Sequence, residues 1–220
     1  MKEEQVREAV VQAMARSEFA RVLAEIVGEE LEGAGTGTGE QESGSEGAKR
    51  LLTKVVLGDI LDDSILAARP GDRTFPLRVF FGELGTLLAH HGQDGPGAHA
   101  ADVAFTVASG LNFFFRAAMD PEAKMRVGLE VSRQVYTLAH DAKLDDDVVA
   151  KATPLLAALM SSELERVRFE TVDHTKVFDS QLHERAADSD ATSSRILRPA
   201  SFLCRVQSNN AVKAKAQVVT

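Results

Sequence analysis

Apolar side chains recur at three- and four-residue intervals through most of residues 3–166, which is the pattern of amphipathic helices. After residue 166 the period shortens toward two, which is typical of strands. The helical intervals predict six helices, over residues 3–31, 48–68, 77–91, 98–119, 121–143 and 148–166. The chain is therefore expected to be mainly α, with a five- to six-helix bundle followed by a small C-terminal β module.

Capping residues mark the start of two of these helices. Asp120-Pro121 combines a capping side chain with proline at the first helical position. The acidic run at residues 145–147 could be taken for a cation site. Acidic side chains that begin a helix are explained by capping and by the helix dipole, so we expect them to cap the helix that follows.

The helix expected over residues 98–119 is apolar around nearly its whole circumference. A helix of this kind normally occupies the centre of a bundle, and we expect it to be the most buried of the set. An alternative stays open, in which the same aromatic side chains line a pocket for a small apolar ligand in a sensor or regulatory domain. The candidate pocket residues are Phe105, Phe113 and Phe114.

Three segments after the helices are expected to be strands, over residues 167–172, 202–206 and 212–220. The last two enclose a polar turn that contains Asn209-Asn210. Asparagine tolerates the positive φ that a tight hairpin requires, so this turn predicts a β-hairpin.

The chain divides into four regions by composition. Residues 1–32 form an amphipathic helix, 33–47 a flexible Gly-rich linker, 48–166 the bundle and 167–220 the β module. The Gly-rich string is not a phosphate loop, because no Gly-Lys-Ser/Thr follows it. The first helix needs a partner for its apolar stripe. Pairing with a second copy in a homodimer and docking on the bundle both stay open.

Charge is distributed unevenly along the chain, which has a net charge of −8. Residues 1–48 hold eleven Glu against four Lys or Arg, a net charge of −7. Residues 191–220 hold five Lys or Arg and no acid, a net charge of +5. The basic end could meet an acidic partner, or its cations could lie on solvated outer faces of strands.

Other features bear on the compartment. The single cysteine, Cys204, excludes an internal disulfide framework and fits a reducing compartment. No apolar run approaches the roughly 18–20 residues of a membrane span, and the acidic start lacks the features of a secretory signal. We expect a cytoplasmic protein without a membrane partner.

Catalytic and metal patterns are weak. Ser201 and Cys204 lie in a predicted strand without a nucleophile elbow, and Asp179 and His183 lack a third catalytic partner. The histidines at 90, 91 and 99 have no Cys, Asp or Glu at a recognisable metal-ligand spacing. The basic tail carries one aromatic residue for stacking, so nucleic-acid binding is not favoured. We expect no enzyme, no metal and no cofactor.

Two motifs in the C-terminal part carry a family resemblance. The first is LERVRFETVDHTKVFDSQLHERA at residues 164–186, and the second is RILRPA at residues 195–200. Both resemble segments of GrpE-type nucleotide exchange factors, which read roughly Leu-Glu…Phe-Asp-Pro-x-x-His-Glu-Ala and Arg-(Val/Leu)-Leu-Arg-Pro-Ala in the same order. The resemblance covers about residues 164–206, with Ser180 where the family has proline.

The resemblance implies a helical dimerisation region joined to a small β domain. It also implies a function, the release of ADP from a DnaK-type chaperone without catalysis. Phe178 would anchor the passage from helix to sheet, Asp179 would cap the next turn, and His183 and Glu184 would bond across to the backbone or side chain of Arg195 or Arg198. All of these contacts could also hold the β module together without touching a partner, and that alternative stays open. The docking surface would be Arg-rich. The implied partner-binding residues are Phe178, Asp179, His183, Arg195, Arg198 and Arg205. A diverged β module that serves another protein partner stays open.

Overall fold

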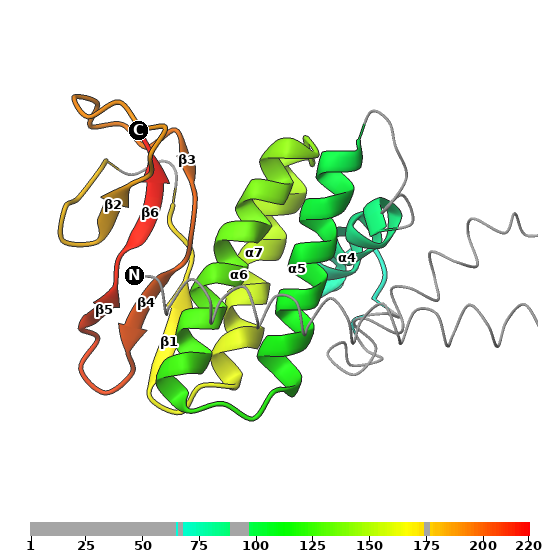
Figure 1. The fold of residues 1–220 in the computed structure, drawn as a ribbon, viewed down its shortest axis with the longest axis horizontal. Coiled ribbons are helices and arrows are strands. Elements are labelled where there is room, and N and C mark those ends of the chain that lie inside the picture. The colour runs from blue at the N-terminus through cyan, green and yellow to red at the C-terminus, as the bar shows by residue number, and fades with distance from the viewer. Residues whose placement is uncertain (1–64, 66–67, 89–96, 174–176) are drawn as a thin grey trace, which may run out of the picture.

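The computed structural model describes residues 65, 68–88, 97–173 and 177–220. The predicted N-terminal helix, the Gly-rich linker, almost all of the helix expected over 48–68, and the histidines at 90 and 91 lie outside these residues. The described chain contains helices in its first part and short strands after residue 166 (Figure 1). The helices are α4 (Phe75–Leu88), α5 (Ala98–Arg116), α6 (Pro121–Asp141) and α7 (Asp146–Ser162).

The expectation of a five- to six-helix bundle is wrong. The described residues hold four helices and two three-stranded sheets. Phe169 and Cys204 from the strands, with Phe202 next to a strand, share one apolar core with Phe114 of α5 and Leu138 of α6. A sheet thus shares the core of the helices, whereas the bundle was expected to bury its apolar stripes between helices alone. Periodicity identifies an apolar stripe on each helix, but it does not say which element buries that stripe.

The two predicted capping sites are confirmed. The Asp120 carboxylate accepts hydrogen bonds from the backbone N–H groups of Glu122 and Ala123, each at 3.0 Å. The Asp145 carboxylate accepts in the same way from Asp147 at 2.8 Å and from Val148 at 3.2 Å. These bonds satisfy donors that the first turn of a helix leaves unpaired.

The α5 helix lies between α4 and α6 (Figure 1). Nine of its 19 residues are buried, a larger share than in α4, α6 or α7. Its all-round apolar character therefore predicted its central place correctly. It ends at Arg116, slightly before the expected end.

The first sheet packs against the helices. Its strands are β1 (Val167–Glu170), β4 (Leu203–Val206) and β5 (Val212–Ala214), in the order β1-β4-β5 and all antiparallel. The predicted hairpin joins β4 to β5, and Asn210 adopts the positive φ of 61° that such a turn requires.

The second sheet lies next to the first, above it in the view of Figure 1, at the end where β5 leads into the following strand. Its strands are β2 (His183–Arg185), β3 (Arg198–Pro199) and β6 (Ala216–Val219), in the order β2-β6-β3. A small apolar core of its own includes Ile196 and Val218. The predicted strand over 212–220 is thus two strands, since the chain leaves one sheet at Lys215 and enters the other.

Candidate functional site

The two motif segments meet on the second sheet. The β2 strand pairs in parallel with one edge of β6, and β3 pairs antiparallel with the other edge. A further antiparallel bridge joins Val177 to Arg195, and the Phe178 N–H donates to the Ser194 carbonyl at 2.8 Å. Segments separated by a polar loop in the sequence therefore form one structural unit.

The side chains of the first motif hold its turn in place. The Asp179 carboxylate accepts from the Gln181 N–H at 2.8 Å, which is the predicted capping contact. The Asp179 N–H donates to Nδ1 of the buried His183 at 3.0 Å. The Arg185 guanidinium stacks 3.9 Å from the centre of the Phe178 ring. Phe178, Asp179 and His183 thus stabilise the module from within.

The three predicted arginines have different surroundings. Arg205 pairs with Glu170 at 3.0 Å, and Arg198 pairs with Asp188 at 2.7 Å. Burial alone raises the pKa of the Glu170 carboxyl, but hydrogen bonds from Arg168 and Arg205 outweigh this effect and lower the pKa below its usual value.

The Arg195 side chain, in contrast, is exposed and has no ion pair among the residues that the structure describes. Arg198 and Arg205 are therefore occupied within the module, and Arg195 is the arginine of the three that is available to a partner.

An exposed apolar and basic surface surrounds Arg195. Val177 is 65% exposed and Leu197 is 60% exposed, and they are the large apolar side chains most open to solvent in the described chain. Ile196 is only 2% exposed, so the alternation of an extended chain directs Arg195 and Leu197 to the opposite, outer face. Val177 faces outward beside Arg195 through their bridge. We refer to these three residues as the Val177–Arg195–Leu197 patch.

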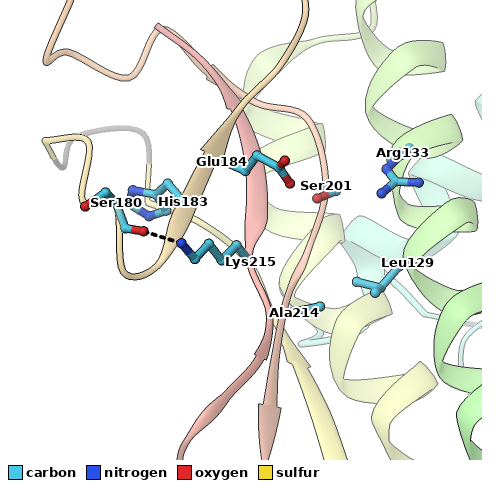
Figure 2. Close-up of a pocket in the computed structure, with 8 residues that line it drawn as sticks. All are labelled: Leu129, Arg133, Ser180, His183, Glu184, Ser201, Ala214 and Lys215. Carbon is cyan, nitrogen blue, oxygen red and sulfur yellow. Dashed lines mark hydrogen bonds between the residues drawn. The ribbon is translucent and has the colours of Figure 1, made fainter.

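A cleft of about 440 Å³ separates α6 from the second sheet (Figure 2). Charged side chains face it from both walls. We refer to it as the α6 cleft. It is lined by Leu129, Arg133, Ser180, His183, Glu184, Ser201, Ala214 and Lys215.

Most polar groups of the α6 cleft already have partners. Lys215 Nζ donates to the Ser180 carbonyl at 2.6 Å, and Ser201 Oγ accepts from the Gln217 N–H at 2.8 Å. Arg133 Nη1 donates to Glu130 at 2.7 Å. The Arg133 Nε atom differs, because it is buried and has no hydrogen-bond partner among the described residues.

Sequence reasoning did not single out Arg133 or Lys215. Leu129 and Arg133 are one helical turn apart and therefore share a face of α6. That spacing predicts a common face but not the element that lies opposite it. The cleft forms where Ala214 and Lys215 come to lie opposite Leu129 and Arg133 of α6, and local sequence patterns do not predict that approach.

The alternative ligand pocket involves residues that pack tightly in the structure. Phe114 is fully buried, and its ring lies 5.0 Å from that of Phe115 in an edge-to-face arrangement. Phe105 is also buried, and Phe113 is partly buried. None of these residues lines the α6 cleft.

In the described ranges, no three His, Cys, Asp or Glu side chains gather closely enough to hold a metal ion. His99 Nε2 instead contacts Asp141 at 3.0 Å. This contact and the His140 hydrogen bond keep the pKa of the Asp141 carboxyl below its usual value, with the His140 bond as the larger cause.

Cys204 lies in the core between β1 and β5. Burial raises the pKa of its thiol from 9.0 to about 11. A nucleophilic cysteine needs the thiolate form at neutral pH, so this residue is a poor candidate for catalysis.

We therefore expect the folded chain to be inert to Ellman's reagent at pH 8 and to react fully in guanidinium. Because the folded pKa is raised, the contribution of the neutral thiol to stability is complete below pH 9.0 and is lost as the pH rises toward about 11. A Cys204→Ala variant should lack this part of the alkaline destabilisation. Rapid stoichiometric labelling of the folded chain would contradict the prediction.

Comparison of this chain with protein-family models, with curated proteins and with solved structures finds no match. None of the helices in the described ranges is both long enough and apolar enough to cross a bilayer. Function must therefore be inferred from the geometry of the second sheet and of the α6 cleft.

Proposed function

We propose that this chain is a non-enzymatic, protein-binding regulator that docks through the Val177–Arg195–Leu197 patch. The proposed partner is a DnaK-type chaperone, from which the chain would accelerate the release of ADP. One observation carries the proposal: the two segments that resemble exchange factors join on β6, and together they expose this patch.

The patch has the chemistry of an interface centre. Apolar side chains beside an arginine are typical of the residues that contribute most to protein binding. Burial of the Val177 and Leu197 side chains against a partner would remove apolar surface from water, which favours binding. Arg195 would supply a charge-assisted hydrogen bond. The patch is small, so further contacts must come from the surrounding surface.

The patch is also held in place before any partner arrives. Ile196 anchors the segment between Arg195 and Leu197 in the core of the second sheet, and the Phe178–Arg185 stack holds the neighbouring segment. A surface that is ordered in advance loses less conformational entropy on binding. The patch is therefore better suited to binding as a preformed surface than to folding upon binding.

Electrostatics indicate an acidic partner surface. Asp188 and Glu170 neutralise Arg198 and Arg205, whereas Arg195 has no ion pair in the described part of the chain. The long-range attraction at the patch should therefore depend mainly on Arg195. Such an attraction weakens as salt is added, so docking should slow with rising ionic strength.

Stopped-flow release of fluorescent ADP from the host's DnaK-type chaperones tests the proposal. Wild-type chain should accelerate release, and Arg195→Glu or Leu197→Glu should reduce the acceleration by about tenfold or more. Arg166→Glu makes the same charge change at an exposed residue beside the first sheet and should act like wild type. Arg198 is less suitable for this test, because its replacement would also break the contact with Asp188.

The possible results separate the parts of the proposal. Absence of acceleration with every chaperone of the host would remove the exchange function. Equal acceleration by wild type and Arg195→Glu would show that docking does not use the patch.

A further inference from the structure

We propose that the α6 cleft binds a small zwitterion of the α-amino acid class, with its carboxylate on Arg133 and its ammonium group beside Glu184. The inference concerns a surface other than the Val177–Arg195–Leu197 patch and does not depend on the chaperone proposal. It rests on the shape of the cleft, one unsatisfied donor and the charges of the two walls.

Arg133 supplies the strongest part of the argument. Its Nη1 is held by Glu130, whose other carboxylate oxygen accepts from Gln134 at 3.0 Å. One donor of this half-exposed side chain is thus paired on α6, while its buried Nε–H has no acceptor among the described residues. A buried donor without an acceptor is unfavourable, and an incoming carboxylate would relieve this cost. The planar guanidinium suits a carboxylate in particular, since two parallel hydrogen bonds can form.

The charges on the opposite wall indicate which second charged group the ligand carries. Glu184 projects from β2 toward the space in front of Ser201 and Arg133 (Figure 2). Lys215 adds a positive charge on the same side, although its ammonium group is already bonded to the Ser180 carbonyl. A simple anion would face Glu184, and a simple cation would face Arg133 and Lys215. A zwitterion places an opposite charge against Arg133 and Glu184 together.

The dimensions of the cleft agree with a small ligand. Its volume of about 440 Å³ lies toward the lower end of the roughly 300–1,000 Å³ found for ligand sites. Leu129 and Ala214 are the apolar members of the lining. They favour a ligand with a hydrocarbon side chain, so L-leucine is the first probe and glycine the smallest member of the series.

The Arg133 Nε–H resonance in a ¹H–¹⁵N NMR spectrum reports directly on the proposed bond. It can be assigned by its loss in Arg133→Lys. Titration of the full chain with L-leucine should move this resonance and saturate. Saturation-transfer difference should show the leucine methyl groups in contact with the protein. Acetate and methylammonium, which each carry half of the charge pair, should bind about tenfold more weakly or worse.

Variants separate the two ends of the ligand. Arg133→Gln should weaken leucine binding by about tenfold or more, as judged by saturation transfer. Glu184→Gln should weaken leucine binding but leave the response to acetate unchanged. Arg126→Gln changes an exposed arginine of α6 outside the cleft and should bind like wild type. Circular dichroism of each variant checks that it is folded. Glu184 is exposed, so its replacement by glutamine should leave the fold intact.

Two results would overturn the proposal. One is an Arg133 Nε–H resonance that moves with none of glycine, L-alanine or L-leucine at tens of millimolar. The other is an equal response to L-leucine, acetate and inorganic phosphate, because that would indicate anion binding without recognition of the ammonium group.

Discussion

Replacement of Phe202 by alanine should lower the free energy of unfolding by about 3–5 kcal/mol. The Phe202 side chain is fully buried, and its ring lies 5.9 Å from that of Tyr136 and 6.1 Å from that of Phe169. Its backbone N–H also donates to the buried Ser132 of α6 at 3.0 Å. Truncation would therefore leave a cavity at the place where the first sheet joins the helices.

Urea denaturation followed by circular dichroism measures this effect. Leu197→Ala is the matched control, because its side chain is 60% exposed and its loss should change stability by no more than about 0.5 kcal/mol. Phe202→Leu should give an intermediate loss if the alanine variant is too unstable to purify. A loss in Phe202→Ala no larger than that in Leu197→Ala would contradict the packing described here.

The second large effect is expected at Gly128, where alanine should destabilise the chain by about 1–3 kcal/mol. A Cβ atom at this position of α6 would lie 2.6 Å from Cζ and 2.7 Å from Cε2 of Phe169. It would also lie 3.0 Å from Cε2 of Phe114. Both rings are buried in the common core, so relief would require the first sheet to shift away from α6.

Gly82 provides the opposite case on α4. A Cβ atom there would meet nothing within 4 Å, so alanine should stabilise the chain by up to about 1 kcal/mol through helix propensity. The two glycine variants should thus change the urea midpoint in opposite directions. A urea midpoint that rises in Gly128→Ala as well would show that close approach to Phe169 does not set the requirement for glycine at 128.

Phe169 connects these stability effects with the candidate docking surface. It lies on β1, whose pairing with β4 positions the first sheet, and the chain passes from that sheet to β6 at Lys215. We expect Gly128→Ala to alter stability while leaving Arg195 in its local bridge with Val177. A loss of docking in this variant without loss of stability would indicate coupling between the core and the patch.

The sequence by itself determined the features that depend on near neighbours. Asp120 and Asp145 cap their helices because the side chain reaches N–H groups two and three residues ahead. The change of period after residue 166 predicted the first strand, and the Asn209-Asn210 pair predicted the turn between β4 and β5. The apolar circumference of the helix expected over 98–119 predicted its central place.

The candidate site was only partly accessible in this way. The two motifs were expected in the β module, where they lie. The turn capped by Asp179 was also predicted, and its carboxylate accepts from the Gln181 N–H. Sequence reasoning treated Arg195, Arg198 and Arg205 as equivalent cations. Their acidic partners lie ten residues away for Arg198 and 35 residues away for Arg205, so no local pattern shows that these two are paired while Arg195 is not.

Only the tertiary structure decided which element covers each apolar face. The expected five- to six-helix bundle was wrong because a sheet carrying Phe169 and Cys204 shares the core of the helices, which the prediction had formed from helices alone. The crossing at Lys215 likewise divides one alternating segment between two sheets and opens the cleft beside Arg133. The helix and strand periods show which nearby residues lie on the same face of an element. Which other element covers that face depends on packing between segments that are far apart in the sequence.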